Sequence, residues 1–282
     1  MSVTMPTTVE ATLEALADTP EAMVLAGGTD AMVEVNYEHR RPTSVVSLRR
    51  VEELRTWSVE DGVVRLGAAV PYTEIERGLV VEAPALAQAS RTVGSPQIRN
   101  TGTVGGNLAT GSPAGDTIPV LAALDAVVEI ASVRGRREVG VEELIVGVKR
   151  TTLADDELIV AIRFPVASGP QEFLKIGPRN AMVISIATCA LVVDGAEQAV
   201  RCALGSVSPA PLRCRDAEAF LADQVVWNGP VPRVDDPRTV ETFGAMVGAA
   251  ASPIDDHRST ADYRRHGVTV MARRALTRAV AS

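Results

Sequence analysis

One glycine-rich segment that leads directly into an apolar segment constrains the fold of this chain more than any other feature. Glycine and small polar residues dominate Thr101–Pro113, and apolar residues dominate Thr117–Leu124. Glycine at this density leaves the backbone too free for the interior of a helix or a regular strand. We therefore predict a loop over Thr101–Pro113 that feeds an amphipathic helix over Thr117–Leu124.

The chain contains two glycine pairs that suit phosphate binding. Gly27-Gly28 follows the short apolar run Ala22–Ala26, which predicts a strand, and Gly105-Gly106 lies in the glycine-rich segment. Glycines after a strand can turn backbone amides to one side and let a ligand approach with no side chain between. Two such loops could clamp a diphosphate, although each pair alone is also compatible with a simple tight turn.

Polar neighbours of the glycine pairs support the same interpretation. Thr29 offers a hydroxyl beside the first pair, and Thr101, Thr103 and Asn107 surround the second. A carboxylate at Asp30 would repel phosphate, so we expect Asp30 to face away and to cap a helix that starts after it. The pattern is neither a dinucleotide fingerprint nor a P-loop, because no GxGxxG or GK[ST] motif occurs.

The order of the predicted elements changes partway along the chain. Helical and strand segments alternate up to the run Glu157–Phe164, which stops at Pro165. After Gly169 the pattern predicts a meander and then three helices, which suggests a domain boundary near Ala167–Pro170. The predicted strands are Glu172–Ile176, Val183–Val193 and Ala199–Val207, with a turn at Asp194-Gly195, and the predicted helices are Arg215–Asp223, Thr239–Ala251 and Thr260–Ala281.

Composition argues against several classes of protein. The formal net charge is −7 with basic residues scattered among acidic ones, so the chain has no basic face for nucleic acid. No run approaches the roughly 18 to 20 apolar residues of a membrane span, and no secretory signal begins the chain, so we expect a cytoplasmic protein. The cysteines Cys189, Cys202 and Cys214 form no CxxC pair, which argues against a disulfide framework, a zinc site or a cluster in this chain.

Five segments, in order along the chain, resemble the FAD-binding subunit or middle domain of the molybdenum hydroxylases, the family of carbon monoxide dehydrogenase medium chains and xanthine dehydrogenases. The second segment is long and specific. The segments are AGGTD (Ala26–Asp30), IRNTGTVGGNLATGSPAGDTIPVLAALDA (Ile98–Ala126), DELIVAIRFP (Asp156–Pro165), FLKIGPR (Phe173–Arg179) and DYRRHGVTVMARRAL (Asp262–Leu276).

The resemblance implies a set of FAD-binding residues. The pyrophosphate would lie on Ala26, Gly27, Gly28, Thr29 and Asp30 and on Thr103, Val104, Gly105, Gly106 and Asn107. Asp116 would lie near the ribityl and ring side, Leu158 and Ile159 would contact the isoalloxazine, and the Lys175 ammonium would lie close to the cofactor. A cation there would stabilise a reduced, anionic ring. Core packing for Leu158 and Ile159 and a surface position for Lys175 remain alternatives.

The resemblance also implies an α+β fold in two domains. Residues 1–168 would form a two-part FAD-binding domain of the vanillyl-alcohol-oxidase or PCMH type, with subdomains of about 1–55 and 56–168. Residues 169–282 would form a small domain with a three-stranded antiparallel sheet and helices.

The function that follows from the resemblance is an electron relay. A large subunit would carry the molybdenum-pterin cofactor and a small subunit would carry 2Fe-2S clusters, and the FAD of this chain would pass electrons to an external acceptor. The complex would be a heterohexamer, as a dimer of heterotrimers. Two alternatives remain, namely a self-contained flavin oxidoreductase of the same fold and a non-catalytic assembly subunit.

Overall fold

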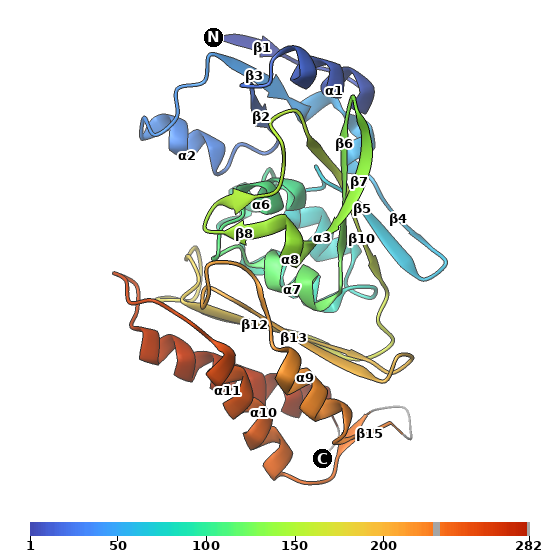
Figure 1. Cartoon of the computed structure of the whole chain (residues 1–282), viewed down its shortest axis with the longest axis vertical. Helices are drawn as coiled ribbons and strands as arrows, with labels where there is room; N and C mark the ends of the chain where they lie inside the picture. Colours follow the sequence, from blue (N-terminus) through green and yellow to red (C-terminus); the bar gives the residue numbers. More distant parts are fainter. Residues whose placement is uncertain (228–231, 281–282) are drawn as a thin grey trace.

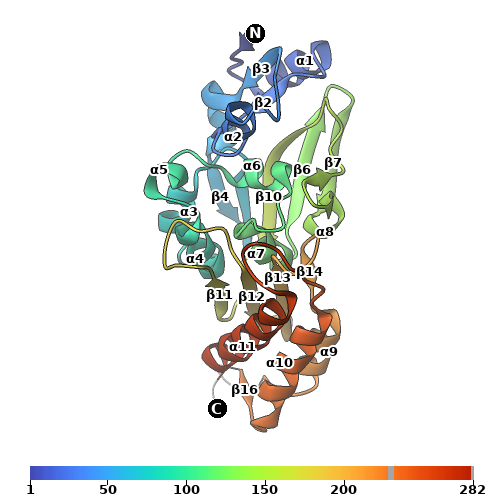
Figure 2. The ribbon, with the colours of Figure 1, turned by 90° about the vertical axis from the view of Figure 1, so that its left-hand side faces the viewer.

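A computed structural model describes residues 1–227 and 232–280 of the chain. Three sheets follow one another along the long axis of the molecule, from the N-terminal sheet to the C-terminal one (Figure 1). A view turned by 90° about the vertical axis shows the three sheets in the same order, with a cluster of helices beside the middle sheet (Figure 2).

The N-terminal layer is a small parallel sheet in the order β1-β3-β2. Its elements are β1 (Ser2–Thr4), α1 (Val9–Asp18), β2 (Met23–Leu25), α2 (Ala31–Asn36) and β3 (Ser44–Ser47), followed by the 3-10 turns η1 (Leu48–Arg50) and η2 (Glu52–Arg55). The hydroxyl of Thr8 caps α1 by accepting a hydrogen bond from the amide of Ala11. The strand predicted from Ala22–Ala26 is confirmed.

The middle layer is an antiparallel sheet in the order β4-β5-β10-β6-β7. Its strands are β4 (Trp57–Glu60), β5 (Val63–Gly67), β6 (Val127–Ser132), β7 (Gly135–Gly140) and β10 (Leu158–Pro165). The helices of this layer are α3 (Tyr72–Gly78), α4 (Pro84–Thr92), α5 (Pro96–Arg99), α6 (Val104–Thr110), α7 (Thr117–Ala123) and α8 (Val141–Leu144), and β8 (Ile145–Gly147) and β9 (Arg150–Thr151) form a separate hairpin.

The prediction of a loop over Thr101–Pro113 is wrong, because most of this segment is helix α6. The Thr103 hydroxyl caps the helix by accepting from the amide of Gly106 at 3.1 Å. Gly105 packs against the backbone of Ala68, where a Cβ would come within 2.7 Å of the carbonyl oxygen. These contacts offset the conformational freedom of the glycines, and Gly111, with φ of 58°, ends the helix.

Helix α7 is also different from its prediction. It begins at Thr117 as expected, but all seven of its residues are buried, so it is not amphipathic. One side of α7 packs against the other helices of the middle layer, and the other side packs against the C-terminal sheet. An apolar helix between two layers therefore replaces the half-exposed helix that the sequence predicts.

The C-terminal sheet has four antiparallel strands rather than the predicted three. They are β11 (Gln171–Ile176), β12 (Ala187–Asp194), β13 (Ala199–Gly205) and the two-residue β14 (Leu212–Arg213), which is too short to show a periodic pattern. The helices are α9 (Arg215–Ala222), α10 (Arg238–Ala250) and α11 (Ala261–Ala279), and β15 (Val225–Val226) pairs with β16 (Arg233–Val234). All three predicted helices are confirmed, and the predicted end at Ala281 lies outside the described residues.

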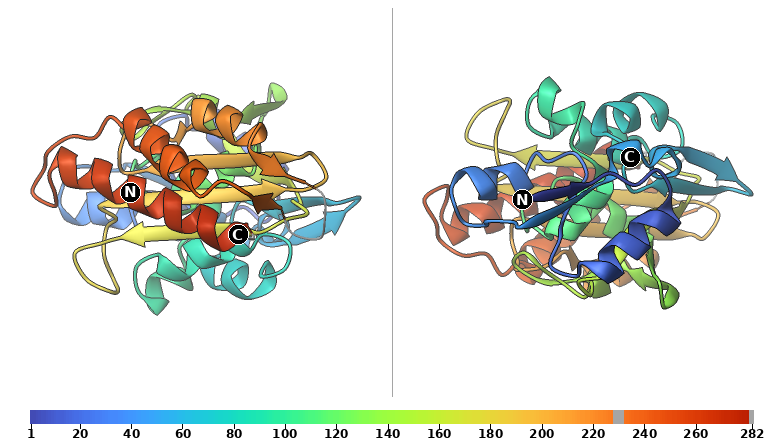
Figure 3. Two further views of the ribbon diagram at one scale, coloured as in Figure 1. Left: turned by 90° about the horizontal axis from the view of Figure 1, so that it is seen from below. Right: turned by 90° about the horizontal axis from the view of Figure 1, so that it is seen from above.

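Strand β12 separates two hydrophobic cores, since all eight of its residues are buried. Ala190 and Val192 belong to the core shared with the middle layer, whereas Cys189 and Leu191 belong to the core beneath α10 and α11. These helices cover the outer face of the sheet (Figure 3). The three cysteines are buried free thiols. Within residues 1–227 and 232–280, no helix has the length and apolar character needed to cross a bilayer.

Candidate functional site

The two glycine segments touch each other through their backbones. A Cβ on Gly27 would collide with the carbonyl oxygen of Thr101, and a Cβ on Gly102 would come within 3.2 Å of the Thr29 hydroxyl. Only glycine allows two main chains to approach so closely. The structure therefore brings together the two segments that the sequence predicts to form one clamp.

The first segment presents backbone amides that are unpaired within the described part of the chain. The N–H groups of Gly27, Gly28, Thr29 and Asp30 donate no hydrogen bond to residues 1–227 or 232–280. Gly28 has φ of 72°, which turns the chain sharply between β2 and α2. Successive N–H groups in such a turn form a concavity that attracts anions.

Asp30 lies where the N-cap of α2 should be, but the prediction that its carboxylate caps the helix is wrong. Its Oδ2 instead accepts a hydrogen bond from the Thr110 hydroxyl at 3.4 Å and lies 3.7 Å from the Lys149 Nζ. The carboxylate is therefore held by α6 and the β8–β9 hairpin and not by its own helix.

In the second segment, by contrast, the backbone amides donate hydrogen bonds to other protein atoms. Gly105 N donates to Ala68 O at 2.9 Å, and the amides of Gly106 and Asn107 donate to the Oγ1 and O atoms of Thr103 at 3.1 and 3.0 Å. An added Cβ on Gly106 meets only the Thr103 hydroxyl, so the helix is open on that side. This segment therefore offers a ligand an open helix face and the Asn107 side chain. Unlike the first segment, it does not offer a row of unpaired amides.

A cleft of about 300 Å³ begins beside Asn107 and Asp116. It lies among α3, the α4–α5 turn, α6, the turn before α7 and the connection between β11 and β12. Its lining residues are Tyr72, Val93, Gly94, Ser95, Ile98, Asn107, Ala114, Gly115, Asp116, Met182, Val183 and Ile184.

Asp116 forms a buried ion pair with Lys175. The Lys175 Nζ lies 2.5 Å from Asp116 Oδ2, and the side chains are 9% and 6% exposed. The same ammonium donates to the carbonyl oxygens of Thr92 and Val183, each at 3.1 Å, so its three donors are all used. Lys175 does not line the cleft. The structure therefore places this lysine behind Asp116 rather than on the cleft surface.

The second oxygen of Asp116, Oδ1, is buried and has no hydrogen-bond partner within residues 1–227 and 232–280. Burial raises the pKa of Asp116 to about 6, and Lys175 and the Thr92 hydroxyl offset part of that rise. Burial, with the nearby charge of Asp116, also raises the pKa of Tyr72. A buried acceptor without a partner at a cleft wall is suited to a ligand that donates an O–H or N–H group.

Leu158 and Ile159 begin β10, and each is only 4% exposed. Because side chains alternate along a strand, Leu158 packs into the core below the N-terminal layer and Ile159 packs into the core of the middle layer. Neither lines the cleft. Their contact with a flavin ring remains a prediction, and the structure does not bring them together with Asp116.

Two polar residues at the site, Thr117 and Tyr72, were not predicted from the sequence. Thr117 donates to Asn107 Oδ1 at 2.7 Å and so ties α7 to α6, and its place next to Asp116 in the motif was an available signal. Tyr72 joins the site through its amide, which donates to Gly102 O at 3.1 Å. No local pattern connects residues that lie thirty positions apart, so Tyr72 had no comparable signal.

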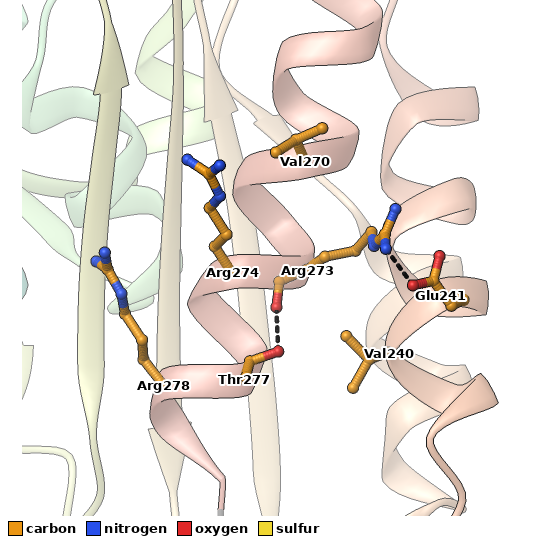
Figure 4. A pocket seen from close by; sticks show the side chains of 7 residues that line it. All are labelled: Val240, Glu241, Val270, Arg273, Arg274, Thr277 and Arg278. Atoms are coloured by element: carbon orange, nitrogen blue, oxygen red, sulfur yellow. Dashed lines mark hydrogen bonds and ion pairs between the residues drawn. The ribbon is translucent and has the colours of Figure 1, made fainter.

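A second cleft, of about 440 Å³, lies between α10 and α11 on the outer side of the C-terminal sheet (Figure 4). Three arginines line it, but Arg273 pairs with Glu241 and Arg278 pairs with Glu172 at 3.2 Å. None of the predicted FAD-binding residues lines this cleft.

Comparison with known proteins places the chain in a family. Residues 1–167 match the model of the FAD binding domain in molybdopterin dehydrogenase, and residues 172–279 match that of the CO dehydrogenase flavoprotein C-terminal domain. The xanthine dehydrogenase FAD-binding subunit of Escherichia coli O157:H7 is 32% identical over 278 residues, which cover 95% of this chain and 91% of that protein. The nicotinate dehydrogenase FAD-subunit of Eubacterium barkeri is 34% identical over 241 residues, or 82% and 77% of the two chains.

A solved structure agrees with these matches. Carbon monoxide dehydrogenase from Hydrogenophaga pseudoflava, in a form that lacks the Mo-pyranopterin moiety, has a chain that superposes with a TM-score of 0.88 at 28% identity and covers 99% of this chain and 96% of its own. The chain therefore belongs to the FAD-binding subunits of the molybdenum hydroxylases and is an FAD-dependent oxidoreductase subunit.

Proposed function

We propose that the pyrophosphate of FAD binds at the junction of the two glycine segments. The observation that carries this proposal is the row of unpaired amides from Gly27 to Asp30, which lies directly against the second segment. These amides supply an anion site, and the open side of α6 at Gly106 leaves room beside it. Among the predicted residues, Ala26, Thr29, Thr103 and Val104 complete this part of the proposed site.

The residues around the cleft fit the remainder of FAD. Asp116 Oδ1 is a buried acceptor without a partner, and hydroxyls of a ribityl chain would satisfy it. Lys175 would then act through Asp116, because its three donors are already engaged. Leu158 and Ile159 remain proposed ring contacts.

We further propose that the chain works as a relay between subunits. Bound FAD can accept electrons singly from iron-sulfur clusters and release them in pairs. A large subunit with the molybdenum-pterin cofactor and a small subunit with 2Fe-2S clusters would be the partners, in a dimer of heterotrimers in the cytoplasm, and an external acceptor would take the electrons. The names of the relatives, which include xanthine and nicotinate dehydrogenases, support this proposal and leave the substrate open.

We also propose a division of the chain into two domains and a fold type for the first of them. The family models match residues 1–167 and 172–279, which supports a division into domains 1–168 and 169–282. The small parallel sheet followed by a larger antiparallel one supports a two-part FAD domain of the vanillyl-alcohol-oxidase or PCMH type.

The proposed cofactor site can be tested by reconstitution. The purified chain, stripped of flavin and then supplied with FAD, should bind it in a one-to-one ratio, measured by flavin absorbance after desalting. Gly106→Val should abolish retention, because the side chain would fill the open side of α6. Gly140→Val is the matched control, since an added Cβ there meets no atom within 4 Å. Retention of FAD by Gly106→Val at the wild-type level would show that the clamp is placed wrongly.

A further inference from the structure

The turn between β8 and β9 connects the end of α6, in the second glycine segment, to α2, which follows the first glycine segment. In this turn the Lys149 amide donates to the carbonyl oxygen of Gly111, the residue that ends α6, at 3.0 Å. The hairpin lies beside α6 (Figure 1). The Lys149 side chain extends to the opposite neighbour, α2, where its Nζ lies 2.7 Å from Glu34 Oε1 and 3.7 Å from Asp30 Oδ2. One residue thus links the end of α6 to the helix that follows the first glycine segment.

Polar contacts hold α2 in place, because none of its residues is buried. The contacts are those of Lys149 with Asp30 and Glu34, and the hydrogen bond from Thr110 to Asp30. The hydrogen bond from Lys149 lowers the pKa of Glu34, and His39 and Arg40 contribute less to that change. Since α2 follows directly after Asp30, these contacts also set the position of the unpaired amides.

The backbone of the turn does not itself favour lysine. Lys149 has φ of 52°, a left-handed conformation that glycine and asparagine adopt at lower cost. The ion pairs that Lys149 forms with Asp30 and Glu34 can offset part of this cost. The ammonium lies among two carboxylates at the edge of the proposed pyrophosphate site, and its charge offsets theirs.

We infer that Lys149 is a positioning residue for the FAD pyrophosphate, which it favours by compensating the charge of Asp30 and Glu34 and by fixing α2. The inference rests on the proposed function, because it requires the phosphates to lie on the first glycine segment. Without Lys149, two carboxylates beside the proposed phosphate site would have no direct counter-charge, and the hydrogen bond from Thr110 to Asp30 would be the remaining polar contact between α6 and the first segment.

The test compares Lys149→Asn with Lys149→Arg in the full chain, using FAD itself as the ligand and flavin fluorescence to measure the dissociation constant. Asparagine suits the backbone conformation, so Lys149→Asn should melt at or above the wild-type temperature and yet bind FAD about fivefold more weakly. Lys149→Arg keeps the charge and should bind within about twofold of wild type. The difference should shrink as salt is added.

Charge compensation is separated from a purely structural tie by the double variant Lys149→Asn with Asp30→Asn, which should recover much of the lost affinity. Equal FAD affinity in wild type and Lys149→Asn would overturn the inference, and a double variant that binds no better than Lys149→Asn alone would overturn charge compensation as its cause. Failure of the wild-type chain to take up FAD would instead overturn the proposed function, so the two failures are distinguishable.

Discussion

The two glycine segments look alike in sequence, but their backbone amides have different partners in the structure. The segment at Gly27-Gly28 leaves its amides unpaired and is held by exposed ion pairs through Lys149. The segment at Gly105-Gly106 is a capped helix whose amides are used inside the protein, and a buried ion pair lies nearby at Asp116. A glycine pair can therefore serve an anion or serve packing, and the partners of its amides decide which.

The largest expected effect comes from the buried ion pair. Lys175→Met should lower the free energy of unfolding by about 3–5 kcal/mol, because Asp116 would have to keep a buried charge without its partner or take up a proton to lose that charge. Urea denaturation measures this change. Glu34→Gln removes an exposed pair of the first segment and should cost less than about 1 kcal/mol. If Glu34→Gln cost as much as Lys175→Met, the contrast between the buried ion pair near the second segment and the exposed ion pairs of the first would not hold.

The pH dependence of stability should carry the signature of Asp116. Its pKa is raised to about 6 in the folded chain from an ordinary value of 3.8, so the folded chain binds the proton more tightly than the unfolded chain does. This contribution is present below about pH 4 and is lost as the pH rises through 6, by up to about 3 kcal/mol. The free energy of unfolding of wild type minus that of Asp116→Asn should therefore fall between pH 4 and pH 7, and a flat difference would refute the raised pKa.

A smaller effect should separate the two glycines of α6. Gly105→Ala should destabilise the fold by about 1–3 kcal/mol, since its Cβ would press on the backbone of Ala68. An added Cβ in Gly106→Ala meets only the Thr103 hydroxyl, and the gain in helix propensity offsets part of any loss of that cap, so the cost should stay below about 1 kcal/mol. Thermal melts of both variants measure the difference. The reverse order would mean that Gly106 is the packing glycine.

Local signals in the sequence predicted most elements of the fold correctly. The Asp194-Gly195 turn and the end of β10 at Pro165 each depend on neighbours along the chain. Helix α6 was missed because the contact that fixes it, between Gly105 and Ala68, joins residues far apart in sequence.

The candidate site shows the same limit. Its glycine motifs were visible, and the resemblance named Asp116 and Lys175. Their pairing was not visible, because they lie fifty-nine positions apart and meet only when β11 packs beside α4. The role of Lys149 was hidden for the same reason, since Glu34 precedes it by more than a hundred residues.

Helix α7, which has no exposed residue, also determines how this subunit can move. A hinge between the middle layer and the C-terminal sheet would bring its apolar side chains into water, at a cost of roughly 1.5–3 kcal/mol for each large one. Opening and closing of these two halves is therefore a poor way to control access to the cleft. The middle layer and the C-terminal sheet should therefore keep a fixed separation while molecules enter and leave the cleft.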